Sequence, residues 1–332
     1  MATVVNAGNL TLADLVKRTD PTGKVASIVE LLTQKNSILP DAVFREGNLP
    51  TGERVSARTG LPGVSWRRFN EGISPSKSRI DQWDEACGQL EGLSIVDCEL
   101  AKLNGNEAAY RQSEDVAFLQ SLSNEVETGL FYHSTKTAPE KFMGLSPRFD
   151  STSSVGGAQI IKHDASASGN DQTSIWLVRW GEDSVYGIYP KGSTGGITPH
   201  DMGEQLVDDG TGANKRFRAY VTNWNWKVGL VVRDFRQVVR IANIDTGNLL
   251  TTGNSLSLSM VKAYHQIWNP AGGRLAWYCN RTIGTYLHQQ AMDSVKNSTL
   301  TIEKIGGQPI TTFLGIPVRE TDAIINGEAP IT

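Results

Sequence analysis

The sequence predicts an α+β protein in which strands outnumber helices. Three features indicate this class: one long amphipathic segment over residues 105–133, a run of alternating polarity over residues 216–244, and abundant turn formers, with 33 Gly and 13 Pro among 332 residues. The chain is long enough for about two domains' worth of packed core, and 39% of its residues are hydrophobic. Disorder throughout the chain is therefore excluded.

Composition also excludes several classes of function. The 32 basic and 35 acidic side chains give a net charge of −3, so the basic footprint of a dedicated nucleic-acid binder is missing. No stretch approaches 18 consecutive apolar residues and the N-terminus lacks a leader pattern, so we expect neither a membrane span nor a signal peptide. Cys87, Cys98 and Cys279 lack CxxC spacing, which favours free thiols and synthesis in a reducing cytoplasm.

Two short amphipathic helices are expected in the first forty residues, with a break at Pro21. Neither helix is long enough to be stable alone, so both must dock onto a core or a neighbouring subunit. The first apolar face consists of Leu12, Leu15 and Val16, and the second of Val25, Ile28, Val29 and Leu32.

Residues 50–90 have few aliphatic side chains, many charges of both signs and several Gly and Pro residues. A stretch of this length without an apolar face cannot form a compact core, and long loops of this kind are usually functional or bound to a partner. We predict a projecting two-stranded arm whose mixed charges suit contact with protein rather than phosphate. The alternative is a solvated, flexible loop.

The segment 105–133 is the strongest helix in the sequence. At 1.5 Å per residue, 25 helical residues would span about 38 Å, so this helix can serve as the backbone of a domain. Its apolar stripe consists of Val116, Leu119, Leu122, Val126 and Leu130, and its polar face of Arg111, Glu114, Asp115, Asn124 and Glu127.

Short strands are expected between turns in residues 144–214, among them SIWLVRWG and VYGIYP. A long strand or hairpin follows, with one strongly aromatic face. Further along, a buried strand ends at Asn280, which can cap a helix; that helix presents Ile283, Leu287 and Ala291. The segment TFLGIPVRETDAI is predicted to be a strand, a turn and a strand. The aromatic face consists of Tyr220, Thr222, Trp224, Trp226, Val228, Leu230 and Val232.

A search for chemistry finds no convincing catalytic constellation. The five His residues are more than twenty positions apart, and no HExxH or GxSxG motif occurs. PKGSTGG lacks the order of a phosphate loop and VDDGTGAN lacks the bidentate Glu of a calcium loop, so both are interpreted as turns. Cys279 is interpreted as a buried thiol. We expect no enzymatic activity, no cofactor and no metal.

Four segments in succession resemble the major capsid proteins of tailed phages with the HK97-like fold. Residues 68–80 are similar to the returning half of the family's E-loop. The long helix and the turn-rich segment after it are similar to the spine helix of the family's peripheral domain, or P-domain. Residues 276–293 resemble the strand and helix of the axial, or A-, domain, and residues 314–325 the late Gly-X-Pro-Val element. The segments SIWLVRWG, GIYPKGS and VVRIANID most resemble the capsid proteins of short-tailed phages related to epsilon15 and Bordetella phage.

One departure from the family pattern concerns strand order. In the family, the P-domain sheet follows the Gly-X-Pro-Val element, whereas here its best candidate, residues 216–244, precedes the A-domain motif. We therefore expect rearranged strand connectivity. The resemblance implies this division of the chain: residues 1–49 as N-terminal arm, 50–90 as E-loop, 91–145 as P-domain with spine helix, 146–259 as a β-rich region including the P-domain sheet, 260–310 as A-domain and 311–332 as C-terminal strands.

The resemblance implies a structural protein that self-assembles into pentamers and hexamers of an icosahedral head enclosing double-stranded DNA. The implied partners are other copies of the chain, scaffold, portal and decoration or cement proteins, and genomic DNA bound on the inner surface without sequence specificity; a membrane is not among them. The chain would be made and assembled in the host cytoplasm and reside in the virion capsid. The expected inter-subunit contacts are Arg54, Arg58, Trp66, Arg67, Arg68, Glu71, Lys77 and Arg79.

The rival hypothesis is a carbohydrate-binding or hydrolytic β-rich protein that uses Trp224 and Trp226 as a platform. Hydrolysis would need two carboxylates at glycosidase separation near these aromatics. Asp234 is the only acid within the patterned run. Alternate aromatics on a strand more often pack a sheet against a helix, which favours the structural interpretation.

Overall fold

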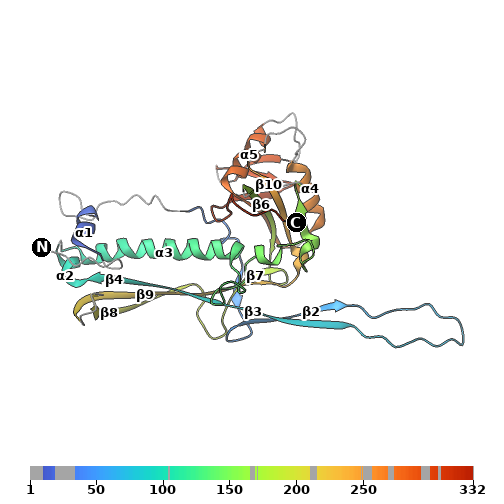
Figure 1. Ribbon diagram of the computed structural model, residues 1–332, viewed down its shortest axis with the longest axis horizontal. Coiled ribbons are helices and arrows are strands. Elements are labelled where there is room, and N and C mark those ends of the chain that lie inside the picture. Colours follow the sequence, from blue (N-terminus) through green and yellow to red (C-terminus); the bar gives the residue numbers. More distant parts are fainter. Residues whose placement is uncertain are drawn as a thin grey trace.

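The computed structural model describes residues 10–18, 34–103, 105–164, 169, 171–209, 215–247, 249, 256–267, 273–292, 300–305 and 308–331. The expected helix with Val25, Ile28, Val29 and Leu32 lies outside these residues, as do residues 210–214 of the VDDGTGAN segment. The molecule has three parts: a long helix on a narrow sheet, a rounded lobe at one end of that layer, and a thin arm that projects past the lobe (Figure 1).

The long helix α3 (Glu107–Tyr132) lies on an antiparallel sheet of β8 (Ile197–Asp208), β9 (Arg216–Val232) and β4 (Gly88–Asp97), with β9 in the middle. We call α3 the spine helix and these strands the spine sheet. At the far end, α1 (Leu12–Arg18) and α2 (Cys98–Lys102) pack beside the start of α3 (Figure 1). Leu15 of α1 is buried there, whereas Val16 is exposed.

The period-two pattern of β9 buries one face of the spine sheet beneath α3. Trp224 and Trp226 are each only 8% exposed and share a core cluster with Leu122, Val126 and Leu130 of the helix. The prediction that the two indoles pack a sheet against a helix is confirmed. A binding platform on these side chains, the basis of the rival hypothesis, is wrong because the helix covers them.

Two details of the predicted helix faces are wrong. Val116 is 44% exposed, because the start of α3 instead buries Tyr110 against α1 and α2. Glu127, placed on the polar face, is fully buried, where its carboxylate accepts hydrogen bonds from Ser37 N (3.2 Å) and Thr321 Oγ1 (2.6 Å). Burial raises the pKa of Glu127. This residue joins the segments around Ser37 and Thr321 to the spine helix.

The lobe is built around β6 (Gln172–Trp180), which lies between antiparallel β10 (Val238–Asp245) and β11 (Arg274–Cys279). β5 (Ile160–Lys162) extends the sheet beyond β10, and β14 (Ile316–Glu320), β13 (Gln308–Phe313) and β12 (Leu300–Ile305) extend it beyond β11. Helices α4 (Leu256–Gln266) and α5 (Arg281–Met292) complete it, with short 3₁₀ turns at Ser146–Arg148, Gly157–Gln159 and Phe235–Gln237.

The junction of the lobe with the spine sheet is made by β7 (Val185–Tyr189), which pairs with β1 (Phe44–Glu46), with β6 and with the end of β9. The run 216–244, expected to belong to the P-domain sheet, is thereby divided. Its first part, β9, forms the spine sheet, and its last part, β10, forms the lobe. The local pattern was correct, but the sheet to which each half belongs depends on distant strands.

Two predicted local elements of the lobe are confirmed. Asn280 caps α5, because its Oδ1 accepts the Ile283 backbone N–H at 2.9 Å, and both Ile283 and Leu287 are fully buried. Leu314 and Gly315 turn β13 into β14 with positive φ angles of 51° and 75°, as a tight two-residue hairpin turn requires. Among the described helices, none combines the length and the apolar character needed to cross a membrane.

The contact between the spine helix and its sheet predicts that substitutions at different positions of the helix's apolar stripe change the free energy of unfolding by different amounts. Leu122→Ala should lower the free energy of unfolding by about 2–5 kcal/mol, because it leaves a cavity in the core. Val116→Ala, at an exposed position, should change the free energy of unfolding by no more than about 0.5 kcal/mol relative to the parent. Denaturant unfolding of both variants measures the difference, and equal losses would contradict the packing described.

Candidate subunit-interaction surface

The arm is an antiparallel hairpin of β2 (Gly52–Gly60) and β3 (Arg79–Ala86), joined by residues 61–78, which we call the tip. It projects away from the body, with the tip farthest from it (Figure 1). The expected two-stranded arm is therefore present, and the alternative of a solvated loop without regular structure is wrong for the paired strands.

The base of the arm is fixed by two buried carboxylates. Glu53 and Glu85 face each other directly across the two strands, and both are nearly inaccessible. Glu53 accepts a hydrogen bond from Tyr186 Oη at 2.8 Å and forms an ion pair with Arg45, whose guanidinium stacks over the Tyr186 ring at 3.9 Å. These partners lie on β1 and β7, so the arm is attached to the junction of lobe and spine sheet.

Glu85 is neutralised by Arg148, which follows the spine helix in the chain. The pair is bidentate, with Nη1–Oε1 at 2.5 Å and Nη2–Oε2 at 2.7 Å, and both side chains are buried. Arg148 also donates to the carbonyls of Met143 (3.1 Å) and Leu230 (3.2 Å). One guanidinium thus joins the arm, the segment that follows the spine helix, and β9.

Glycine is needed at the first residue of β2. Gly52 has a φ of 156°, and a Cβ there would lie 1.9 Å from the Glu85 carbonyl oxygen. Any side chain at this position would therefore separate the strands at the point where the two glutamates are held.

Two of the expected contact residues are satisfied within the arm itself. Arg54 donates to both carboxylate oxygens of Asp84, at 2.7 and 2.8 Å, across the strand pair. Arg79 Nε lies 3.1 Å from Asp81 Oδ1, and Asp81 also accepts from Thr59 Oγ1 at 2.8 Å. Hydrogen bonds from Arg54 to Asp84, and from Thr59 and Arg79 to Asp81, lower the pKa of each carboxyl. These side chains therefore already have charged partners within the arm and do not need one from a neighbouring molecule.

The other expected contact residues remain open to a partner. Arg58, Arg67 and Lys77 are exposed and have no ion-pair partner among the residues that the structure describes. The backbone N–H of Arg68 donates to Glu71 Oε2 at 3.2 Å. The tip therefore presents positive charge in excess.

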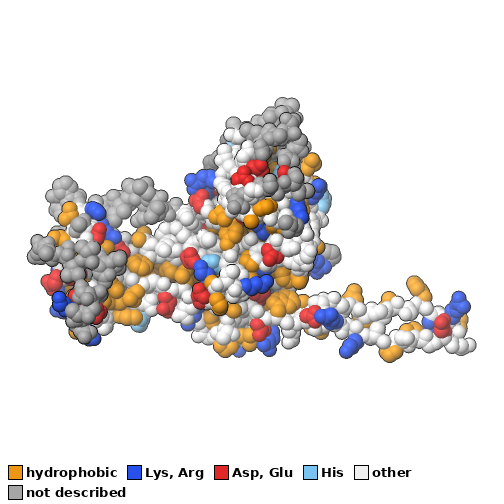
Figure 2. All heavy atoms as spheres, viewed as in Figure 1, with side chains coloured by type: hydrophobic (Ala, Val, Ile, Leu, Met, Phe, Trp, Pro, Cys, Tyr) orange, Lys and Arg blue, Asp and Glu red, His pale blue; other side chains and the backbone are white. Residues whose placement is uncertain are grey.

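Apolar side chains crowd the same tip without any cover. Trp66, Phe69, Val64 and Leu61 are almost completely exposed, and hydrophobic side chains follow the arm along its length (Figure 2). Sequence reasoning identified Trp66 but missed the other three, although each stands as an apolar residue in a turn-rich segment. Exposed apolar groups in such number mark an interaction site.

The described residues contain no cluster of His, Cys, Asp or Glu that could hold a metal ion. Cys279 is fully buried, and desolvation raises the pKa of its thiol, which agrees with its interpretation as a buried thiol.

Comparisons with known proteins identify chains of similar sequence and fold. The family model described as major capsid protein GP7 matches residues 20–332. The solved structure of a bacteriophage epsilon15 chain is 38% identical, with full coverage of both chains and a TM-score of 0.81. The bacteriophage JBD30 capsid is similar in fold, at 10% identity, 89% and 93% coverage and a TM-score of 0.51. A comparison with curated proteins found no match.

The buried ion pair at the arm base should matter more to stability than the exposed pair on its shaft. Arg148→Met leaves Glu85 buried without a counter-charge and should cost about 3–5 kcal/mol of unfolding free energy. Arg54→Met removes a solvent-exposed partner of Asp84 and should leave the unfolding free energy almost unchanged, because water screens this pair. Denaturant unfolding compares the two, and similar small losses would contradict the proposed attachment of the arm.

Proposed function

The chain belongs to the GP7 family of major capsid proteins, and from this premise we propose that it assembles into pentamers and hexamers of an icosahedral phage head enclosing double-stranded DNA. As a major capsid protein it is a structural component of the virion and not an enzyme. Its HK97-like fold agrees with the similarity to the epsilon15 and JBD30 structures.

The observation that carries the proposal is the uncovered apolar tip on an arm attached by buried ion pairs. Folded monomers rarely keep aromatic side chains such as Trp66 and Phe69 in water. A capsid subunit gains from this arrangement, because an arm held in one direction reaches a neighbour without losing much conformational entropy on contact. A stable interface buries about 1,600 Å², and a lattice subunit makes several.

The partner that we propose for the tip is another copy of the chain. Arg58, Trp66, Arg67, Arg68, Glu71 and Lys77 would contact this neighbour, while Arg54 and Arg79 stiffen the arm that carries them. Guanidinium groups can bind a neighbour's carboxylates through two hydrogen bonds, and the indole can fill an apolar contact.

Further parts of the proposal concern domains and other partners. Residues 1–49 would be the N-terminal arm, 50–90 the E-loop, 91–145 the P-domain with spine helix, 146–259 the β-rich region, 260–310 the A-domain and 311–332 the C-terminal strands. Scaffold, portal and decoration or cement proteins would contact the shell. DNA would lie on its inner surface without sequence-specific contacts, since a net charge of −3 does not favour a tight grip on phosphate. Synthesis and assembly would occur in the host cytoplasm.

Assembly itself is tested by size-exclusion chromatography and electron microscopy of the purified chain. We expect pentamers, hexamers or shell-like particles. A monomer that stays monomeric at every concentration, and forms no particles, would contradict the proposed function.

The tip arginines should stabilise the lattice without stabilising the subunit. Replacing both Arg67 and Arg68 with Ala should preserve the melting temperature but lower particle yield, with the largest deficit relative to the parent at low salt, where the lost charge pairs are least screened. Light scattering across a salt series measures this yield. The matched control replaces both with Lys, which keeps the charge and should recover part of the yield. Particle yields equal to the parent at every salt concentration would reject the interface role.

A further inference from the structure

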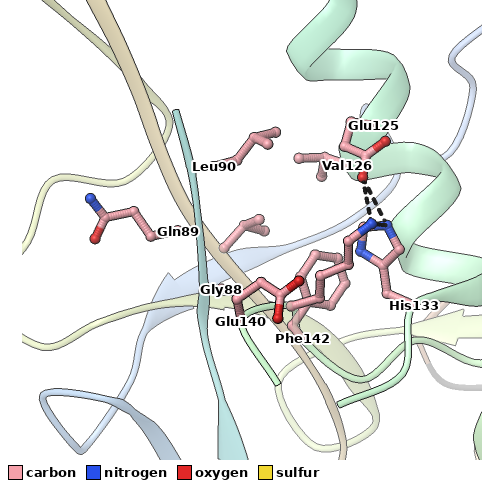
Figure 3. Close-up of a pocket in the computed structure, with 10 residues that line it drawn as sticks. Gly88, Gln89, Leu90, Glu125, Val126, His133, Glu140 and Phe142 are labelled. Atoms are coloured by element: carbon pink, nitrogen blue, oxygen red, sulfur yellow. Dashed lines mark hydrogen bonds and ion pairs between the residues drawn. The ribbon is translucent and has the colours of Figure 1, made fainter. Parts of the chain in front are cut away.

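A hollow of about 110 Å³ lies at the foot of the arm, between the end of the spine helix and the start of β4 (Figure 3). Its floor is apolar and is formed by Leu90, Val126, Phe142 and Val228. A cavity of about 150 Å³ can hold a benzene molecule. Because this hollow is open on one side, one ring of an aromatic side chain can enter it while the rest stays at the mouth.

The rim of the hollow carries a net negative charge. Glu125 Oε1 lies 2.9 Å from Lys141 Nζ and 3.1 Å from His133 Nε2, so one lysine and one glutamate offset each other (Figure 3). Burial is the main cause of the lowered pKa of His133, which leaves the imidazole neutral at pH 7. Glu140 is exposed and has no ion-pair partner in the described part of the chain, so its charge is not compensated.

The tip of the same chain cannot reach this hollow. β3 ends at Ala86, two residues before Gly88 of the hollow's lining. The eight residues of β3 carry the tip away by roughly 27 Å at about 3.4 Å per residue. The two features can therefore meet only between different copies of the chain.

We propose that the hollow receives Trp66 from the tip of a neighbouring copy. This inference rests on the proposed function and names the receiving site for the arm. The tip carries Arg67, Arg68 and Lys77 against Glu71, an excess of two positive charges, and would meet a rim with one uncompensated carboxylate. The indole loses its full exposure to water, and the apolar floor gains a further aromatic partner from the neighbour.

Cross-linking tests this contact in assembled particles. The variant Ser65→Cys with Pro139→Cys keeps both Trp66 and Glu140, and it places one thiol beside the indole and the other at an exposed position next to the hollow's rim. A short bis-maleimide should produce a ladder of linked subunits on a denaturing gel. The control variant pairs Ser65→Cys with Val155→Cys, which is also exposed but lies outside the hollow, and should give no ladder.

The native cysteines should contribute few cross-links of their own. Burial raises the pKa of the Cys87 thiol to about 12, so almost none of it is the reactive thiolate. Cys98 and Cys279 are buried. The single variant Ser65→Cys measures the remaining background.

Substitution of the indole gives a second, independent measurement. Trp66→Ala should raise the subunit concentration needed for half-maximal assembly about tenfold or more, as expected for an aromatic anchor. Phe69→Ala, equally exposed on the same tip, should have a smaller effect. Equal effects would overturn the choice of Trp66.

The failure of this inference differs from the failure of the proposed function. Particles that form normally but give no ladder, or the same ladder with Val155→Cys, would overturn the hollow as receiving site and leave the capsid role intact. Absence of particles from the unsubstituted chain would overturn both.

Discussion

Two carboxylates buried opposite each other set the geometry of this molecule. Like charges directly across a strand pair destabilise a sheet, and an isolated two-stranded hairpin is marginally stable in water. Glu53 and Glu85 avoid both difficulties because Arg45 and Arg148 neutralise them from different parts of the body. The arm can leave the body in one direction, since any other direction would separate these pairs.

Sequence patterns predicted the elements whose formation depends on nearby residues. Alternation through Trp224 and Trp226 predicted the strand and its buried face, because side chains on a strand alternate whatever lies above them. Asn280 predicted the start of α5, since capping involves only the next three residues. The arm was predicted from the absence of an apolar face over residues 50–90.

What the sequence could not predict depends on partners distant in the chain. In the sequence, nothing distinguishes Glu53 and Glu85 from exposed surface charges. Only the fold places Arg45, Arg148 and Tyr186 beside them. Glu127 faces the segments around Ser37 and Thr321, about 90 and 194 positions away. The same limit applies to the hollow at the arm base, whose floor combines the spine helix, β4, β9 and the loop before Arg148. Periodicity describes one element and does not say which other element will cover it.

The order of strands in the spine sheet has a consequence for the newly made chain. β4 is synthesised first, but its partner β9 comes about 120 to 140 residues later, as in the pairing of Gly88 with Val228. Pairings at such separation form slowly. The apolar side of α3 is therefore without its cover for roughly 5 to 20 s, at ribosomal rates of about 5–20 residues per second. During that interval the nascent chain exposes hydrophobic surface of the kind that promotes aggregation, and a ribosome that pauses before Val232 prolongs this exposure.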